Sequence, residues 1–534
     1  MLKRLIRLVK TLTVRRKGAA IRPVPKATVT THNLKGPCTF VAVHELLSQS
    51  FDMLFRDFII EGKTAVKAYL VCVDGMVSKE LVNDFVLKTL MVQSLGKPAL
   101  AKLTPETARE TVYSFLLANN EVRKEDSLAG TVDSILSGDS ALFFADRPGA
   151  IIIGTRGWEQ RGINEPTTES VIRGPREGFS ETLRINTSLL RRKIKSPDLV
   201  MKPLKIGELT RTDIVIAYVS GIASKPILQE LENRLRAIKI DGVLESGYIE
   251  ELIEDVPCSP FPQVYHTERP DGVAANLLEG RIAVLVDGTP IVLIVPAQLV
   301  QFLQMSEDYY ERSYAALLIR LVRLSGVAAS LLLPSLYVAV TTFHQEMLPT
   351  ALALSIASGR EGVPVPALVE ALVMEFTLEV LREAGIRLPK TVGQAISIVG
   401  ALVIGDAAVK AGLVSPLMVI VVAFTAIASF TIPAYNLGIT IRLLRFPLML
   451  LAGTLGFFGL SLGYYLIVLH LCCLRSFGIP YLGPFGPGNL YDLLKDTFFR
   501  APWWALRTRP RLPGKKDRAF SSSGSIKALE DEPS

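Results

Sequence analysis

The stretch FPLMLLAGTLGFFGLSLGYYLIVLHLCCL, residues 446–474, decides the class of fold, because it contains no Asp, Glu, Lys or Arg. About 20 apolar residues are enough for a helix to cross the hydrocarbon core of a bilayer. Two further uncharged stretches, residues 324–343 and 411–441, precede it. Most of the charged residues lie before residue 313. The sequence therefore predicts an integral membrane protein with a polar N-terminal half and an apolar C-terminal half.

Positive charge is unevenly distributed along the chain, whose formal net charge is +8. It is concentrated in an N-terminal arm, residues 1–50, a connector, residues 161–204, and a tail, residues 488–534. The arm lacks an apolar run long enough for a secretory signal. It fits a basic helix on an anionic leaflet, or else a solvated tail. We expect the C-terminal tail to be disordered and cytoplasmic. Nucleic acid is not an expected partner, because no basic patch is interleaved with aromatic residues.

Two segments of the polar half repeat one pattern: an apolar strand, a glycine turn, a serine that can cap and an amphipathic helix. They are AVKAYLVCVDGMVSKELVNDFVLKTL, residues 65–90, and DIVIAYVSGIASKPILQELENRLRAI, residues 213–238. A second pair, residues 132–155 and 273–296, repeats a helix ended by glycine, a strand, a tight turn and a strand. We therefore expect an α/β soluble region of two related subdomains, residues 51–160 and 205–305, followed by an all-α polytopic membrane domain, residues 306–487.

The soluble half shows no motif of a known enzyme chemistry. A Walker loop, a GxGxxG after a strand, HExxH and GxSxG are all missing, and the five cysteines have no metal-binding spacing. His266 stands alone, which is more typical of a structural histidine than of a catalytic one. Asp287 next to Gly288 is explained by turn chemistry. We predict no enzymatic activity, no cofactor and no metal site.

The membrane domain is expected to contain about five or six helical segments. The first span, about residues 317–341, follows several arginines, so the positive-inside rule places its start in the cytoplasm. Residues 348–358 are too short to cross and fit a re-entrant or interfacial piece. A later span, residues 413–437, is expected to return to the cytoplasm, with Arg442 and Arg445 on that side.

The last apolar stretch can be read in two ways. A single crossing would place the basic tail outside, against the positive-inside rule. A helical hairpin broken between Gly456 and Gly463 would keep the tail inside, and we favour it.

Acidic residues within the membrane domain need an explanation, because a charge in hydrocarbon costs several kcal/mol. At about 100° per residue, Glu375, Glu379 and Glu383 lie within about 80° of one another on a helix. Such a stripe can face a water-filled path, pair with cations on neighbouring helices or leave the bilayer at the interface. The next predicted span is rich in small residues, which favours close packing of helices, with or without a pore. The candidate pore or gating residues are Glu375, Glu379, Glu383, Gln394, Ser397, Gly400, Gly405 and Asp406.

Several long phrases of the sequence resemble one family. They include CSPFPQVYHTERPDGVAANLLEGRIAVLVDGTPIVLIVP, residues 258–296, SGREGVPVPALVEALVMEFTLEVLREAGIRLPK, residues 358–390, and IASFTIPAYNLGITIRLLRFPLMLLAG, residues 427–453. They resemble the A subunit of GerA-type spore germination receptors, and the likeness covers about residues 51–487. The segment DGMVSKELVNDFVLKTLM looks more like the branch of nutrient receptors than like a related branch of A-like proteins. Members of that second branch do not belong to a trio of subunits that binds nutrients.

The resemblance implies a receptor in the inner membrane of the endospore, with a cytoplasmic N-terminal domain. It implies B and C receptor subunits as partners, nutrient sensing mainly by the B subunit, and self-association of the A subunit into a ring, expected as a pentamer, that conducts monovalent cations. Two other functions stay open. One is a non-conducting scaffold or signalling subunit, and the other is a secondary transporter, which predicts paired repeats within the membrane domain.

Overall fold

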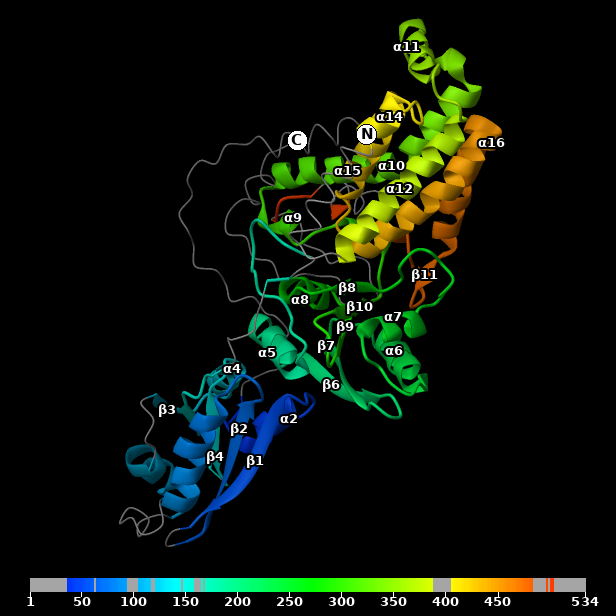
Figure 1. The fold of residues 1–534 in the computed structure, drawn as a ribbon. Coiled ribbons are helices and arrows are strands. Elements are labelled where there is room, and N and C mark those ends of the chain that lie inside the picture. Colours follow the sequence, from blue (N-terminus) through cyan, green and yellow to red (C-terminus); the bar gives the residue numbers. More distant parts are fainter. Residues whose placement is uncertain are drawn as a thin grey trace, which may run out of the picture.

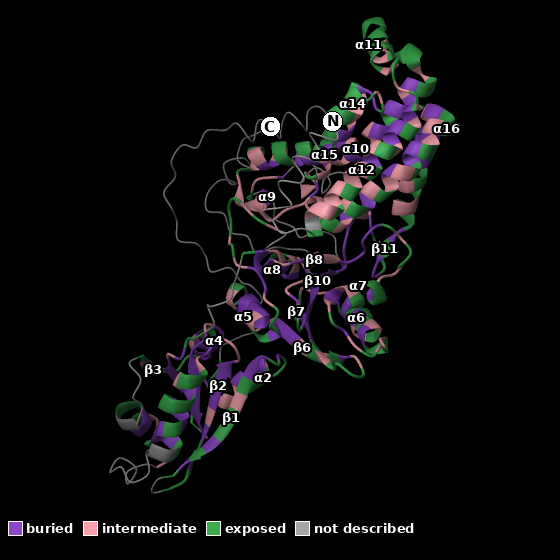
Figure 2. Ribbon diagram, viewed as in Figure 1, coloured by how far each residue is buried: buried purple, intermediate pink, exposed green. Residues whose placement is uncertain are grey.

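The computed structural model describes residues 36–61, 64–93, 104–116, 121–145, 147–157, 165–166, 169–387, 405–483, 496–497 and 500–503. Two α/β subdomains and a bundle of helices follow one another along an elongated molecule (Figure 1). Buried residues dominate the inner strands of both subdomains, whereas the helices of the bundle keep much of their outer surface exposed (Figure 2).

Subdomain 1 is an antiparallel sheet with helices packed against it. Its strands are β1 Met53–Ile60, β2 Val66–Val73, β3 Val122–Glu125, β4 Ser140–Phe144 and β5 Ala150–Ile153, in the order β1-β2-β4-β5-β3. Its helices are α2 Phe40–Leu47, α3 Ala108–Thr111 and α4 Leu128–Leu136, with π-helical segments Leu81–Leu87, Thr89–Gln93 and Val112–Leu116.

Subdomain 2 has the same plan. Its strands are β6 Leu199–Ile206, β7 Thr212–Val219, β8 Tyr265–Thr267, β9 Ile282–Val286 and β10 Val292–Val295, in the order β6-β7-β9-β10-β8, again antiparallel. Its helices are α5 Leu183–Lys193, α6 Lys225–Ala237, α7 Ser246–Ile253 and α8 Pro270–Leu278.

The glycines that marked the repeat in the sequence occupy equivalent places in the two subdomains. Gly138 and Gly280 both have positive φ, 96° and 99°, a region that favours glycine. A Cβ at Gly138 would lie 3.1 Å from the carbonyl oxygen of Met76, and one at Gly280 would lie 3.1 Å from that of Ile222. Together with the shared strand order, this confirms the predicted relation between the two subdomains.

Each subdomain begins earlier than the predicted boundaries at residues 51 and 205. Helix α5 falls within the predicted connector, yet its residues Leu183, Leu189 and Leu190 are buried in the core of subdomain 2. Helix α2 falls within the predicted arm and packs on subdomain 1. The basic residues of α5 made this segment resemble a solvated linker, but one of them, Arg191, is itself buried.

A buried ion pair joins the two subdomains. The guanidinium of Arg191 on α5 donates to both carboxylate oxygens of Asp52, at 2.9 and 3.0 Å, and to Ser50 Oγ at 3.0 Å. The backbone N–H of Met201 also donates to Ser50 Oγ, at 3.1 Å. Arg191 and Asp52 are almost fully buried. This contact fixes subdomain 1 against the first strand of subdomain 2.

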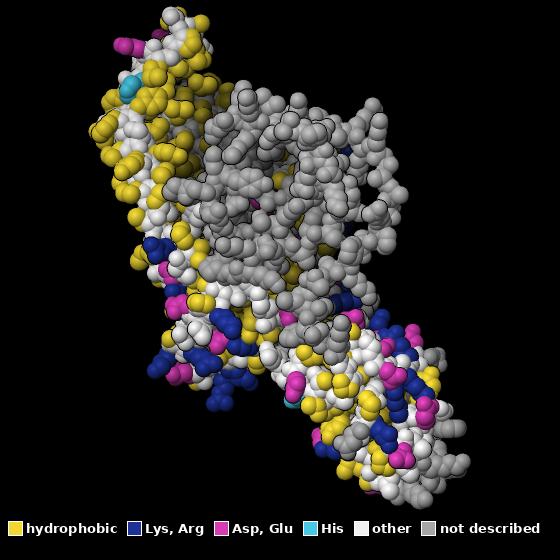
Figure 3. Space-filling model, turned by 180° about the vertical axis from the view of Figure 1, so that it is seen from behind, with side chains coloured by type: hydrophobic (Ala, Val, Ile, Leu, Met, Phe, Trp, Pro, Cys, Tyr) yellow, Lys and Arg dark blue, Asp and Glu magenta, His cyan; other side chains and the backbone are white. Residues whose placement is uncertain are grey.

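The C-terminal part is a bundle of helices. They are α9 Glu307–Tyr310, α10 Ser313–Phe343, α11 Thr350–Arg360, α12 Ala367–Arg387, α14 Gly405–Lys410, α15 Pro416–Ser429 and α16 Tyr435–Cys473, with 3₁₀ turns Leu299–Leu303 and Gln345–Met347 and a two-stranded ribbon, β11 Arg475–Ser476 and β12 Ile479–Pro480. In the described part of the chain, α10 and α16 are long and apolar enough to cross a membrane. Hydrophobic side chains dominate the visible surface of the bundle, and charged ones gather over the subdomains (Figure 3).

The predicted span over residues 413–437 is interrupted in the structure. Helix α15 ends at Ser429, and α16 begins at Tyr435. Pro433 lies between them. Proline has no N–H to donate and therefore cannot continue a helix from the preceding turn. Helix α11, by contrast, matches the short segment that was expected not to cross, and none of its residues is buried.

Helix α16 reverses direction at Gly456, as the hairpin interpretation predicted. Gly456 has φ 61° and ψ −140°, which is not helical. A Cβ at Gly463 would lie 2.6 Å from Leu448 Cδ2, a distance that a straight helix does not allow over fifteen residues. We call residues 435–455 the first leg and residues 457–473 the second leg of this hairpin. Both legs start or end next to subdomain 2.

Replacing Gly456 by alanine is expected to destabilise the fold by about 1–3 kcal/mol, because a non-glycine residue is strained at this φ and ψ. The added Cβ would also lie 2.7 Å from His344 Cε1 and 3.0 Å from Phe343 Cβ. Thermal unfolding of the purified protein in nanodiscs measures the effect. Gly438→Ala is the matched control, because nothing lies within 4 Å of its added Cβ. An unchanged Tm in the Gly456 variant would contradict the turn.

Candidate functional site

The acidic residues of α12 point into the bundle rather than toward its outer surface along most of the helix. Glu370 and Glu375 are 1% and 0% exposed, and Glu379 is partly buried. Their partners come from α15, from the first leg of α16 and from α12 itself. We call this set of ion pairs the charged core of the bundle.

The centre of the charged core is the pair formed by Glu375 and Arg445. Arg445 lies on the first leg and is 1% exposed. It donates to Glu375 Oε2 and reaches α10, where it donates to the carbonyl oxygen of Ser330 at 2.8 Å and to Ser330 Oγ at 3.0 Å. One arginine therefore joins three helices, and its charge is compensated within the chain.

Glu379 lies one turn further along α12 and is shared by two arginines. Arg382 of the same helix donates to Glu379 Oε1 at 3.1 Å, and Arg442 of the first leg donates to Oε2 at 3.3 Å. Arg382 also donates to Ser429 Oγ, at the end of α15, at 3.1 Å. Glu379 and Arg382, three residues apart on α12, therefore form an ion pair.

Glu370 closes the other end of the charged core. Its Oε1 accepts from the backbone N–H and the hydroxyl of Ser415, at 2.5 and 2.6 Å. Ser415 is the N-cap of α15, and its hydroxyl accepts from Met418 N. The carboxylate therefore sits at a helix N-terminus, where the partial positive charge of the dipole favours it. Arg360 lies 3.9 Å from the other oxygen.

The remaining predicted pore or gating residues lie elsewhere. Glu383 pairs with Arg387, and Asp406 with Lys410, and both pairs are exposed. Gly405 is buried at the start of α14. Gln394, Ser397 and Gly400 lie outside the described residues. The predicted stripe thus divides into a buried acid, Glu375, a partly buried acid, Glu379, and an exposed acid, Glu383.

Arg442 and Arg445, which were expected to follow a returning span, lie within a helix. Both are part of the first leg, because α16 begins at Tyr435, before them. The two arginines are three residues apart and the two acids four, and each spacing is about one helical turn. On antiparallel helices, Arg442 therefore meets Glu379 where Arg445 meets Glu375. That match is the signal in the sequence that would have paired them, and it was missed because the arginines look like a flanking cluster.

Both feet of the hairpin are bonded to one loop of subdomain 2, residues 254–263. The hydroxyl of Thr440 on the first leg donates to the carbonyl oxygen of Pro260. His470 Nε2 on the second leg lies 2.8 Å from Ser259 Oγ. Asn436 Nδ2 also lies 3.1 Å from His266 Nδ1, on the edge strand β8. The loop is therefore the direct connection between the soluble region and the helices that carry the charged core.

Glu254, in this loop, has an unusual acidity. Burial raises its pKa to about 7, against the effect of a hydrogen bond from Gln263 N, and the neighbouring Glu250, Glu251 and Asp255 act in the same direction as burial. The folded protein therefore holds a proton that the unfolded chain releases near pH 4.5.

The stability of the loop region is therefore expected to fall as pH rises from about 5 to about 7 and to level off above that range. Over this range unfolding releases a proton from Glu254. The Glu254→Gln variant should lose this part of the pH dependence, whereas Glu208→Gln, a change of an exposed residue outside this group of acids, should keep it. Hydrogen exchange of residues 254–263 in the full chain, followed from pH 5 to pH 8 and corrected for intrinsic exchange, measures it. Identical profiles for all three proteins would contradict the assignment.

Comparisons with known proteins agree with the resemblance seen in the sequence. The family model described as Bacillus/Clostridium GerA spore germination protein matches residues 42–512. An uncharacterized membrane protein of Bacillus subtilis, YfkQ, is 49% identical over 460 residues, which cover 86% of this chain and 87% of that protein.

Several relatives carry a germination name. Spore germination protein KA of Bacillus subtilis is 46% identical, over 88% of this chain and 85% of its own length. Spore germination protein GerLA of Bacillus cereus is 39% identical, over 89% of this chain and 95% of its own length. A solved crystal structure also matches, that of the N-terminal domain of the A subunit of the Bacillus megaterium spore germinant receptor GerK3. Its sequence is 33% identical, the match covers 53% of this chain and 100% of the GerK3 domain, and the TM-score is 0.39. The chain belongs to the GerA family, as an A subunit of the spore germination receptors.

Proposed function

We propose that this chain is the non-enzymatic membrane subunit of a nutrient-responsive germination receptor, and that copies of it form a ligand-gated cation channel that starts ion release. The proposed assembly is a ring, expected as a pentamer, that works with B and C receptor subunits in the inner membrane of the endospore. Its two α/β subdomains are proposed to lie in the cytoplasm. The family relation and the apolar helices support the membrane location.

The placement of the exposed acids is the observation that carries the channel proposal. Glu383 lies near the end of α12, close to Arg382, which contacts the end of α15. Asp406 lies on α14, and Gly412, which follows that helix, packs against Gly362 at the opposite end of the bundle. Glu383 and Asp406 therefore lie toward opposite ends of the bundle. Acidic groups at both mouths of a path would attract cations from either side.

The buried ion pairs suit a gate better than a pore lining. Glu375 and Glu379 are already neutralised by arginines of the hairpin. A conformation in which the hairpin moves away from α12 would free these charges. A ligand-loaded partner subunit would favour such a state only through a higher affinity for it.

Purified protein in liposomes tests the proposal. We expect flux of monovalent cations through the assembled native protein, and we expect the double variant Glu383→Gln, Asp406→Asn to lower cation flux by about two- to tenfold, because the local concentration of cations falls. The double variant Glu208→Gln, Glu251→Gln, at two exposed residues of the soluble region, is the control for the loss of two negative charges. Equal flux in all proteins would remove Glu383 and Asp406 from the ion path.

A non-conducting scaffold is the second candidate. It is favoured by the same charged core, because Glu370, Glu375 and Glu379 find partners within one chain and do not require a shared aqueous lumen. Assembled native protein that clusters with its partner subunits but passes no ions in liposomes would select this candidate.

A further inference from the structure

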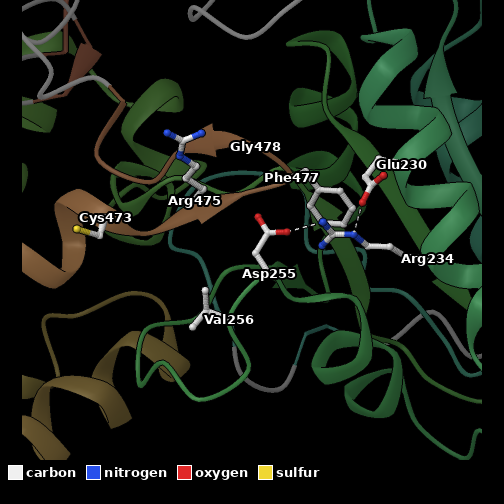
Figure 4. A pocket seen from close by; sticks show the side chains of 8 residues that line it. All are labelled: Glu230, Arg234, Asp255, Val256, Cys473, Arg475, Phe477 and Gly478. Atoms are coloured by element: carbon white, nitrogen blue, oxygen red, sulfur yellow. Dashed lines mark hydrogen bonds and ion pairs between the residues drawn. The ribbon is translucent and has the colours of Figure 1, made fainter.

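A pocket of about 510 Å³ lies where the hairpin re-enters the soluble region. Its walls come from helix α6, from the residues after α7, and from the end of α16 with the β11–β12 ribbon (Figure 4). The lining residues are Glu230, Arg234, Asp255, Val256, Cys473, Arg475, Phe477 and Gly478. Its volume is in the range of sites for small molecules.

One of its two arginines is fully engaged. Arg234 donates to Glu230 Oε1 at 2.8 Å and to the carbonyl oxygen of Ile253 at 2.6 Å, and it pairs with Asp255 Oδ1 at 2.5 Å. Its guanidinium also lies over the ring of Phe477, 4.4 Å from the centroid. Glu230 and Asp255 each use one oxygen in these pairs, so each retains a second oxygen that can accept a hydrogen bond.

The other arginine is uncommitted. Arg475 is exposed, and its guanidinium has no hydrogen-bond or ion-pair partner within the described part of the chain. In Figure 4, Asp255 lies between Arg475 and Arg234. The pocket thus holds two carboxylates and two guanidiniums, with no net charge. The guanidinium of Arg475 and one oxygen each of Glu230 and Asp255 remain available to a ligand. A ligand that carries an anionic group and an ammonium group matches this arrangement.

The second leg of the hairpin leads from the bundle to this pocket. Leu462, Leu466 and Leu469 are exposed, and together with Cys473 they follow the spacing i, i+4, i+7 and i+11, which places them on one face of a helix. Cys473 is the last residue of α16 and lines the pocket. The second leg of 17 residues spans about 25 Å, close to the thickness of a hydrocarbon core of about 30 Å. A hairpin inserted in the bilayer would therefore bring the pocket at its base to the lipid headgroups.

We propose that this pocket binds the headgroup of a zwitterionic phospholipid with a primary ammonium, that is, a phosphatidylethanolamine. The phosphate accepts from Arg475, the ammonium donates to Glu230 and Asp255, and an acyl chain lies along the apolar face of the second leg. An anionic headgroup such as phosphatidylglycerol offers no donor with a positive charge and meets the two carboxylates. Phosphatidylcholine has a quaternary ammonium, which cannot donate a hydrogen bond. The lipid therefore ties the second leg to subdomain 2 beside the loop that holds both feet of the hairpin.

Thermal unfolding of the full chain in detergent, titrated with single lipids, tests this site. Phosphatidylethanolamine is expected to raise the Tm saturably and at lower concentration than phosphatidylglycerol or phosphatidylcholine. Arg475→Gln should weaken the apparent affinity for phosphatidylethanolamine about tenfold, the effect of losing one charged hydrogen-bonding group. Arg236→Gln, a change of an exposed arginine on the same helix as Glu230 that does not line the pocket, should leave the affinity unchanged.

Three results would overturn the proposal. The first is an equal response of the native protein to phosphatidylethanolamine and phosphatidylglycerol, which needs no variant and is therefore independent of folding defects. The second is an unchanged affinity in Arg475→Gln. The third is a full response to water-soluble phosphoethanolamine alone, which would assign the pocket to a free small molecule instead of a lipid.

Discussion

Replacing Arg445 by methionine is expected to destabilise the membrane bundle by about 3–5 kcal/mol, because removal of one partner leaves the other charge buried and unpaired. Glu375 would remain within the bundle without its guanidinium, and Ser330 would lose two hydrogen bonds from α10 to the hairpin. The loss is measured by thermal unfolding in nanodiscs and by the yield of folded protein in membranes.

The double variant Glu375→Met, Arg445→Met distinguishes a charge effect from a packing effect. Removal of both partners avoids the unpaired charge, so most of the stability should return. Arg387→Met is the matched control, because its pair with Glu383 is exposed and contributes at most about 1 kcal/mol. A single Arg445 variant as stable as the control would show that the pair does not hold the bundle together.

Replacing Arg191 by methionine is expected to have an effect of similar size, about 3–5 kcal/mol, on the soluble region. The side chain holds Asp52 and Ser50 of subdomain 1 and also donates to the carbonyl oxygens of Ser196 and Leu199. Its loss would leave a buried carboxylate and would separate the subdomains. Hydrogen exchange and limited proteolysis of the full chain, with thermal unfolding, would report that separation.

Arg184→Met is the matched control for this prediction. Arg184 lies on the same helix and pairs with Asp74 at 2.6 Å, but it is half exposed, so its loss should cost less than about 1 kcal/mol. The double variant Asp52→Leu, Arg191→Met should recover part of the stability. If Arg191→Met unfolded with the same Tm and the same proteolytic pattern as the control, the proposed junction would be wrong.

The sequence was sufficient for the fold class, for the repeat and for the reversal in the last apolar stretch. Each of these depends on local periodicity, on glycine turns such as those at Gly75 and Gly221, or on the side of the membrane that basic residues prefer. The boundaries of the subdomains were missed, because α5 ends in a basic run, residues 191–193, that makes the segment look like a solvated linker although its leucines are buried.

The partners of the acids could not be predicted in the same way. Glu375 and Arg445 are 70 residues apart, and their contact depends on which helices are neighbours and on their relative register along the bundle. Periodicity defines a face of one helix, but it does not say which helix covers that face. The sequence therefore located the acids correctly on α12 and left open whether water, a sister chain or an arginine neutralises them.

The anchoring of both hairpin feet on the loop around Ser259 and Pro260 has a mechanical consequence. Because both legs of the hairpin are held at their base, a small rotation of the soluble region would displace the far end of the hairpin more than its base. The first leg of 21 residues is about 31 Å long, and a tilt of about 5° at the base would displace the turn at Gly456 by roughly 2–3 Å. Arg442 and Arg445, nearer the pivot, would travel a shorter distance, which is the scale on which a hydrogen-bonded ion pair is either kept or broken.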